Sequence, residues 1–209
     1  MKIIEIEGDK RLNGTIRISG AKNATVALIP AAILTDEEAT ICNVPEITDT
    51  DALCDILKDL NVSANRSTES IVINPKDMQN TCITEPYSKK LRASYYFMGV
   101  LLGKYKETRM CFPGGCSIGE RPINLHLKGF EKLGATIEED DGNFTIYADK
   151  LIGDEIFLDV PSVGATINIM LAAVLSGGKT VIDKGVANIT AEPDTSGIPG
   201  MNVVVTINV

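Results

Sequence analysis

The sequence predicts a single α/β domain over residues 1–209, of an inside-out, barrel-like kind with helices packed inside and sheets facing out. One observation is repetition: a helix–strand–helix–hairpin order recurs every roughly 55–65 residues, which is typical of units that pack together on shared helices. A second observation is that three helical stretches are apolar on most or all faces, so each must be enclosed by other elements. The repetition predicts three units, the third one shortened, at residues 14–75, 88–148 and 155–209.

The first unit begins with alternating residues 14–18, which predict a strand. An apolar helix follows over 21–33, where Pro30 predicts a kink or an early end. Residues 39–44 predict a further strand, and Thr48 or Thr50 is expected to cap the next helix. That helix has apolar residues at helical spacing, at Leu53, Ile56, Leu57 and Leu60. A hairpin formed by residues 61–65 and 70–74 completes the unit.

The second unit repeats this order. Its apolar helix over 91–103 is followed by a strand-like run at 108–112 and a helix-like run at 123–133. Two further strands flank the sequence Asp140-Asp141-Gly142 and predict a hairpin, because Asp-Gly is a strong turn signal.

The third unit departs from the pattern after its apolar helix, which is expected over 162–175 with Ser162 as N-cap. Residues 186–200 carry two prolines and two glycines with few apolar residues, so we expect a loop or disorder there and no full amphipathic helix. Strands are expected at 155–159, 179–183 and 201–209.

The composition excludes several classes of function. A hydrophobic content of 44% supports a core, whereas a net charge of −8 argues against a nucleic-acid partner. The five cysteines are irregularly spaced without a CxxC pair, so they predict neither a zinc site nor a disulfide framework and fit a reducing cytosol. No signal peptide is recognisable and no apolar run approaches the roughly 20 residues of a membrane span. We therefore expect a cytoplasmic protein with no membrane partner.

The stretch from Pro113 to Pro122 concentrates glycine, proline, cysteine and arginine in one predicted loop. Its glycines allow positive φ and hinge motion. Cys116 is then either a thiol that solvent or substrate can reach or an inert cysteine in a surface crossover. The residues of the loop leave both readings open.

The first helix of each unit begins with a candidate anion site, because helix N-termini present free N–H groups and a positive dipole end. Lys22 and Asn23 lie at the first start, Arg92 near the second, and residues 162–164 at the third. Arg121 lies at another helix start, where its guanidinium can clamp phosphate. Taken singly, the cations are ordinary surface charges; their shared position in the repeats predicts a polyanionic ligand.

His126 is the only histidine. A lone histidine on a helix is more often a packed or surface residue than a base, so we do not expect it to be catalytic. The acidic run 138–141 is best explained as a solvated hairpin turn.

Five segments together resemble the UDP-N-acetylglucosamine enolpyruvyl transferases, the bacterial enzymes of the first committed step of peptidoglycan synthesis. The resemblance covers residues 1–183, and its cysteine loop separates this family from the related shikimate-phosphate enolpyruvyl transferases, which share the repeat fold. The segments are S-G-A-K-N at 19–23, L-R-A-S at 91–94, P-G-G-C-S-I-G-E-R-P at 113–122, L-H-L-K-G-F-E-K-L-G-A at 125–135 and P-S-V-G-A-T-I-N-I-M at 161–170.

The resemblance implies transfer of the enolpyruvyl group of phosphoenolpyruvate to UDP-N-acetylglucosamine, with release of phosphate and without metal or cofactor. Cys116 would be the general acid on a closing loop and the residue alkylated by fosfomycin. Lys22 and Asn23 would contact phosphoenolpyruvate or the sugar, and Arg92 and Arg121 would hold phosphates. The UDP-sugar site would be lined by Arg121, Pro122, Ile123, Asn124, Leu125, Ser162, Val163 and Gly164.

Two departures from the family pattern stand out. Asn124 occupies a position where the family usually has Asp, which would alter a nucleotide contact. The chain is also about half the family length, and the resemblance implies a second domain that supplies a general-base Asp and further arginines. We therefore expect a folded, loop-bearing half that is inactive alone. The alternatives are a non-catalytic UDP-sugar-binding or assembly domain, and a homodimer in which a second copy replaces the missing domain.

Overall fold

The computed structural model describes residues 13–83, 92–111, 123–140, 143–183, 188–193 and 203–208, together with residues 3, 5, 8 and 11. Its helices are α1 (Lys22–Ala31), α2 (Thr48–Asp59), α4 (Tyr96–Tyr105), α5 (Asn124–Lys132) and α6 (Val163–Ala173), with 3-10 helices η1 (Ala32–Leu34) and η2 (Arg92–Tyr95). Its strands are β1 (Ala39–Cys42), β2 (Ser63–Arg66), β3 (Ser70–Asn74), β4 (Glu107–Cys111), β5 (Thr136–Asp140), β6 (Asn143–Tyr147), β7 (Glu155–Phe157), β8 (Thr180–Asp183), β9 (Asn188–Pro193) and β10 (Val203–Asn208).

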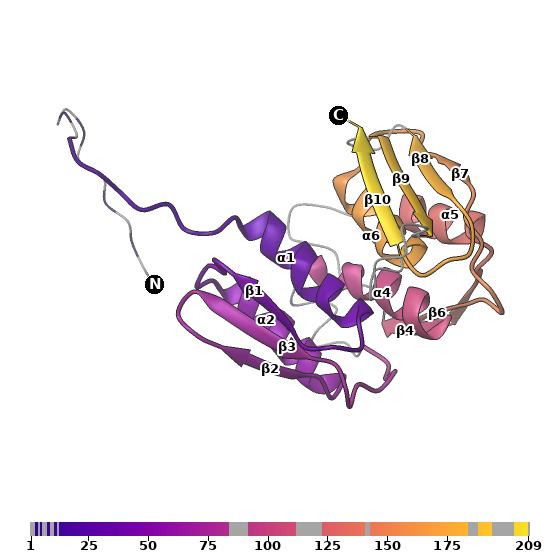
Figure 1. Ribbon diagram of the computed structural model, residues 1–209, viewed down its shortest axis with the longest axis horizontal. Coiled ribbons are helices and arrows are strands. Elements are labelled where there is room, and N and C mark those ends of the chain that lie inside the picture. The colour runs from indigo at the N-terminus through magenta and orange to yellow at the C-terminus, as the bar shows by residue number, and fades with distance from the viewer. Residues whose placement is uncertain are drawn as a thin grey trace.

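The described strands form three sheets, with the orders β1-β3-β2, β4-β6-β5 and β10-β9-β8-β7 (Figure 1). Both predicted hairpins are confirmed, because β2 pairs with β3 and β5 pairs with β6, each antiparallel. In the third sheet β7 pairs in parallel with β8 across α6, and Ile83 likewise pairs in parallel with Met110 across α4. The same helical crossover therefore occurs twice. The boundaries of the three units stay a prediction.

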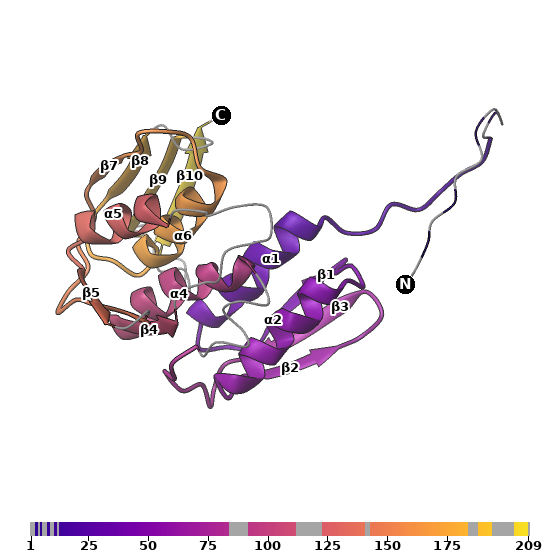
Figure 2. The same cartoon turned by 180° about the vertical axis from the view of Figure 1, so that it is seen from behind.

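The apolar helices α4 and α6 lie at the centre of the domain, with the sheets outside them (Figures 1 and 2). All residues of α4 from Phe97 to Gly103 are buried. Strands β3, β4 and β6 instead alternate between buried and more exposed residues, as expected when a sheet packs one face on the core. The structure thus confirms the predicted α/β fold with α4 and α6 as central helices. The helix expected over 21–33 is not enclosed on all sides, because α1 buries one face and its Leu28 is 50% exposed.

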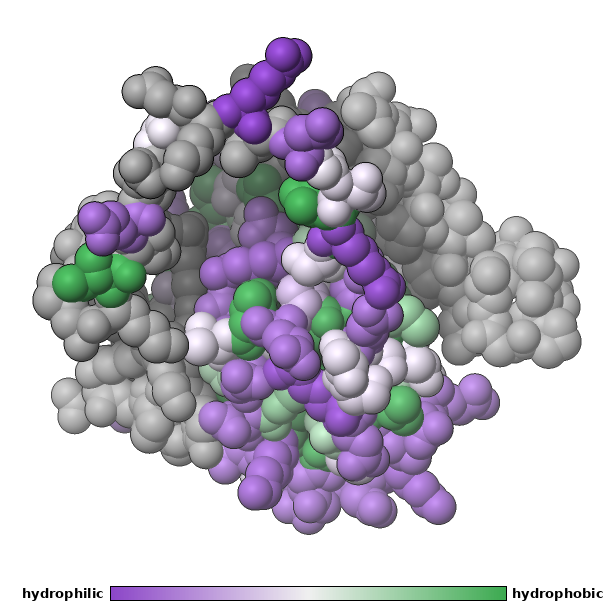
Figure 3. Space-filling model, turned by 90° about the vertical axis from the view of Figure 1, so that its left-hand side faces the viewer, coloured by the Kyte–Doolittle hydropathy of each residue, from purple (hydrophilic) through white to green (hydrophobic). Residues whose placement is uncertain are grey.

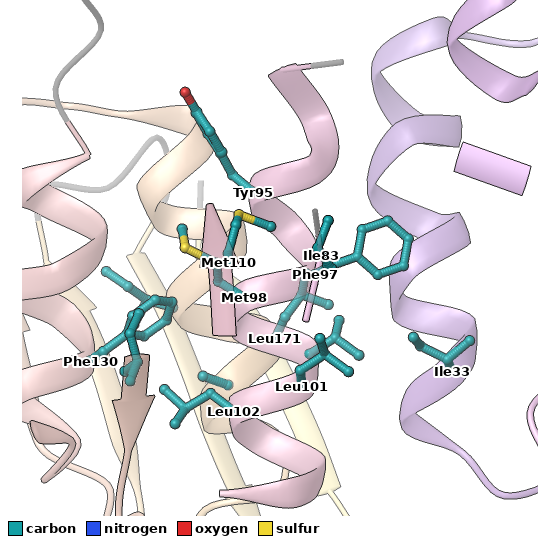
Figure 4. Close-up of a cluster of buried hydrophobic side chains, with 14 of the residues drawn as sticks. Ile33, Ile83, Tyr95, Phe97, Met98, Leu101, Leu102, Met110, Phe130 and Leu171 are labelled. Carbon is teal, nitrogen blue, oxygen red and sulfur yellow. The ribbon is translucent and has the colours of Figure 1, made fainter. Parts of the chain in front are cut away.

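The core is continuous across α4. Figure 4 shows Phe97 and Leu101 on the side of Ile33 from η1, and Leu102 on the side of Phe130 from α5. These five side chains are fully buried, which is why α4 has no polar face.

Glycines set how closely the central helices approach. A Cβ added at Gly99 of α4 would lie 2.2 Å from the backbone oxygen of Asn168 in α6. One added at Gly129 of α5 would lie 2.2 Å from Cδ1 of Ile169. Real Cβ atoms do not approach backbone this closely, so α4 and α6 contact at a distance that only glycine allows at position 99. At position 129 a side chain would require Ile169 to move.

Two predicted segments are corrected by the structure. Residues 14–18 form no strand; the side chains of Ile16 and Ile18 are 85% and 82% exposed, and the segment leads away from the body of the domain (Figure 1). Alternation produces a strand only where a neighbouring edge accepts its N–H and C=O groups. Conversely, the loop predicted over 186–200 contains β9, which pairs with β8 and β10. Its prolines and glycines all lie at the last residue of β9 or beyond it.

Helix ends were predicted less well than helix positions. The early end near Pro30 is confirmed, because α1 stops at Ala31 and continues as η1. Neither Thr48 nor Thr50 caps α2: the N-cap is Ile47, and the Thr50 hydroxyl donates to the carbonyl of Pro45 at 3.2 Å. The helix expected over 91–103 begins as η2 and runs on to Tyr105.

We expect Gly99→Ala to lower the free energy of unfolding by about 1–3 kcal/mol, because the added methyl group forces α4 away from α6. Urea unfolding followed by circular dichroism measures this. Gly14→Ala is the control, since a Cβ at Gly14 meets nothing within 4 Å. Equal stability of the two variants would show that the helices do not approach as closely as described.

Candidate functional site

The starts of α5 and α6 lie together. Gly164 is the second residue of α6, and a Cβ added there would be 3.5 Å from both Cε1 and Nε2 of His126, the third residue of α5. Residues 123–125, the described part of the 121–125 segment expected to line a UDP-sugar site, are therefore neighbours in space of residues 162–164.

The start of α6 is organised by Ser162, which confirms the predicted N-cap. Its hydroxyl oxygen accepts from the N–H of Ala165 at 3.3 Å, and its carbonyl accepts from the N–H of Thr166 at 2.9 Å. The N–H groups of Val163 and Gly164 come first in the helix and have no acceptor among the described residues. No described residue competes for these N–H groups, so an anion can bind there, which the positive end of the helix dipole also favours.

The start of α5 presents one apolar and one polar residue. Ile123 is buried as the N-cap, and its carbonyl accepts from the N–H groups of His126 at 2.9 Å and Leu127 at 3.1 Å. Asn124 is exposed and Leu125 is half-buried. Asn124, the residue that departs from the family pattern, is thus placed where a ligand could contact it.

A buried amide connects these starts to α4. Asn168 of α6 is fully buried, and its Nδ2 donates to the carbonyl of Tyr95 at 2.8 Å and lies 2.9 Å from Nδ1 of His126. Its Oδ1 accepts from the N–H of Gly99 at 2.8 Å. Tyr95 and Gly99 are four residues apart, so the amide contacts both the carbonyl and the N–H group of one helical turn at the junction of η2 and α4.

His126 is packed within this junction. It is 6% exposed, and its ring meets that of Tyr95 edge-on with centroids 5.9 Å apart. Burial lowers the pKa of His126 from 6.5 to about 4, so the imidazole is neutral at physiological pH. The expectation of a packed histidine agrees with this, but sequence reasoning missed its place beside Gly164.

The start of α1 is stabilised by an ion pair and by close packing. Lys22, its first residue, forms an ion pair with Asp49 of α2, and Asn23 is exposed. The preceding Gly20 is required by packing, because a Cβ there would overlap the backbone oxygen of Asn43. Lys22 therefore has a protein partner when no ligand is bound.

The structure describes little or nothing of the other predicted site residues. Arg92 is the first residue of η2, and its side chain lies outside the description. Cys116, Arg121 and Pro122 lie outside the described residues, as does the rest of the 112–122 stretch. The convergence of cations on a polyanion therefore stays a prediction.

The remaining described surface is largely polar. Figure 3 shows mainly hydrophilic residues on one face, with hydrophobic ones scattered among them. Glu138–Asp140 are exposed, and the Tyr147 hydroxyl donates to Glu138 at 2.8 Å, which fits a solvated hairpin. Within the described ranges, no three His, Cys, Asp or Glu side chains cluster as ion ligands. No helix in the described part of the chain is long and apolar enough to cross a membrane.

The buried histidine predicts a pH dependence of stability. Because the pKa of His126 falls from 6.5 to about 4 on folding, the unfolded chain binds a proton in this window that the native chain does not. Stability should fall as the pH drops from 7 to 4, with roughly 3 kcal/mol of the loss due to this residue. Urea unfolding of the chain and of His126→Asn checks this. His126→Asn should lose less stability between pH 7 and pH 4 than the unsubstituted chain. Equal losses in both proteins would contradict the lowered pKa of His126.

Known proteins match this chain over most of its length. The sequence profile of the family described as EPSP synthase (3-phosphoshikimate 1-carboxyvinyltransferase) matches residues 6–205. UDP-N-acetylglucosamine 1-carboxyvinyltransferase 2 of Bacillus subtilis (strain 168) is 48% identical over 194 residues, 93% of this chain and 44% of that protein. The enzyme of the same name from Listeria monocytogenes serovar 1/2a is 49% identical over 189 residues, 90% of this chain and 44% of that protein. The chain thus spans less than half the length of these curated relatives.

Solved structures support the fold. The enolpyruvyl transferase NikO from Streptomyces tendae aligns with a TM-score of 0.74 at 20% identity, covering 96% of this chain and 49% of its own. An EPSP synthase from Acinetobacter baumannii aligns with a TM-score of 0.60 at 18% identity, covering 88% of this chain and 41% of its own. Since the family profile spans nearly the whole sequence, the chain belongs to the EPSP synthase (3-phosphoshikimate 1-carboxyvinyltransferase) family.

Proposed function

We propose that the chain forms the cysteine-loop-bearing half of a UDP-N-acetylglucosamine 1-carboxyvinyltransferase. Such an enzyme moves the enolpyruvyl group of phosphoenolpyruvate to UDP-N-acetylglucosamine and releases phosphate. The observation that carries the proposal is the 48% identity to the Bacillus subtilis enzyme across 93% of this chain. Because the chain spans 44% of that enzyme, a second domain or a second protein would complete the active site.

The neighbouring starts of α5 and α6 support a role in binding the UDP-sugar. The free N–H groups of Val163 and Gly164 suit a diphosphate oxygen, and the exposed Asn124 lies on the adjoining helix start. We assign the UDP-sugar to the two segments 121–125 and 162–164.

The remaining roles follow the family pattern. Lys22 and Asn23 would contact phosphoenolpyruvate or the sugar, which requires Lys22 to exchange its pairing with Asp49 for a ligand. Arg92 and Arg121 would hold phosphates. Cys116 would protonate C3 of phosphoenolpyruvate while the sugar oxygen adds to C2. Loss of a proton from C3 and of phosphate from C2 then restores the enol double bond in the product.

We place this activity in peptidoglycan synthesis in the cytoplasm, and so in cell shape and division, with fosfomycin as an alkylating inhibitor of Cys116. A second candidate is a non-catalytic UDP-sugar-binding or assembly domain. The observation that favours it is that the two neighbouring helix starts, of α5 and α6, both belong to this chain.

The two candidates differ in what the isolated chain does. Half a cleft should give no turnover in a phosphate-release assay and should bind UDP-N-acetylglucosamine weakly in calorimetry. A dedicated binding domain should instead bind with a Kd in the micromolar range or below, about −8 kcal/mol or more favourable. Clear turnover by the chain alone would contradict the half-enzyme proposal.

Fosfomycin tests the role of Cys116. Intact-mass spectrometry after incubation should show one adduct, which disappears in Cys116→Ala because that thiol is the nucleophile. Cys111→Ala is the matched control, since Cys111 ends β4 a few residues earlier in the chain. It should keep the adduct. An adduct that survives Cys116→Ala, or no adduct at all, would contradict the reactive role of Cys116.

A further inference from the structure

Two cysteines that the proposed function does not use lie beside each other on the surface. Ile83 pairs in parallel with Met110 of β4. Its N–H donates to the carbonyl of Arg109 at 3.1 Å, and its carbonyl accepts from the N–H of Cys111 at 3.2 Å. Cys82 directly precedes Ile83 in the chain, so this pairing holds Cys82 next to the last residues of β4.

The side chains of Cys82 and Cys111 share the outward face of this pairing. Ile83 and Met110 are each 1% exposed and belong to the core. Because successive side chains of extended backbone point to opposite sides, the neighbouring residues Cys82 and Cys111 face outward. Cys82 is exposed and Cys111 is half-buried. Two cysteines can be joined only where their Cβ atoms do not point apart, and these two meet that condition.

Cys82 lies in a small polar cavity whose walls are fixed. The cavity has a volume of about 280 Å³, and its other described lining residues are Asn80, Thr81, Glu107 and Arg109. Nδ2 of Asn80 donates to the carbonyl of Glu107 at 3.0 Å, and the Thr81 hydroxyl donates to the carbonyl of Asp59 at 3.3 Å. These bonds hold the segment that carries Cys82 in place, and the cavity leaves room for a small reagent.

The two thiols also act on each other. Partial burial raises the pKa of the Cys82 thiol, and the hydrogen-bonded Cys111 thiol raises it further, whereas the Arg109 guanidinium lowers it. Both thiols are free in the structure. Cys54 differs from them, because the neighbours that act on its pKa are charged groups and not a thiol. The described chain therefore holds one thiol pair in contact and offers Cys54 as an unpaired comparison.

We propose that Cys82 and Cys111 are a redox-active dithiol, a modification site that a two-electron oxidant of the peroxide class converts into a reversible disulfide. Two S–H bonds break and one S–S bond forms, so the thiols lose two electrons and two protons. The peroxide takes these up as its O–O bond breaks, which gives two molecules of water. A transient disulfide of this kind is compatible with a reducing compartment. The proposal does not depend on the proposed function.

The first experiment maps the bond in the folded chain. After treatment with hydrogen peroxide, the chain should lose the mass of two hydrogen atoms and regain it with dithiothreitol. Trypsin cleaves after lysine and arginine but not before proline, so it should release residues 77–89 joined to residues 110–128. Absence of this joined pair from the oxidised chain would overturn the proposal.

Variants identify the partner of Cys82, because residues 110–128 contain both Cys111 and Cys116. Cys116→Ser should keep the cross-link to residues 77–89, and Cys111→Ser should lose it. Cys54→Ser is the matched control and should keep it. A cross-link that survives Cys111→Ser, or one that disappears in Cys116→Ser, would contradict the assignment of Cys111.

The second experiment measures whether the fold brings the thiols together. Equilibration of Cys116→Ser with reduced and oxidised glutathione gives the effective concentration of the Cys82 thiol toward the Cys111 thiol. This concentration should be at least about tenfold higher in the folded chain than in urea, because folding holds the two thiols in contact. Equal effective concentrations in the folded and the unfolded chain would overturn the proposal.

Discussion

The centre of this domain depends on one buried amide. From within α6, Asn168 bonds to two backbone groups at the η2–α4 junction and to His126 on α5. All its partners are buried, so the network is satisfied without water. Removing the amide would leave Nδ1 of the buried His126 without this partner in the core, which costs more than the bond itself. The glycines at the helix crossings let the backbones approach closely enough for these bonds to form.

This junction also determines how the candidate site is presented. It holds the starts of α5 and α6 side by side, and burial there keeps the imidazole of His126 neutral. The proposed cationic groups come from other parts of the chain, such as Lys22 at the start of α1. In this arrangement the helix starts would bind a diphosphate group through rigid backbone N–H groups, and longer side chains would supply the positive charge.

The sequence predicted the parts that depend on local pattern. Apolar periodicity located the central helices, turn residues located both hairpins, and Ser162 marked the start of α6 correctly. Residues 14–18 were misassigned because a strand requires a partner edge that local alternation does not reveal. β9 was missed because pairing with two neighbours outweighs a weak local preference. The place of His126 beside Gly164 and its contact with Asn168 were missed, because Asn168 is 42 residues away in the sequence. No local pattern carries that information.

Amide hydrogen exchange at Gly99 tests the central claim most directly, because this N–H donates to the buried side chain of Asn168. If the amide of Asn168 is an integral part of the core, the Gly99 N–H exchanges only through global unfolding, as slowly as that of the fully buried Leu101 in the same helix. Fast exchange at Gly99 beside slow exchange at Leu101 would show that the junction opens locally and would contradict the account.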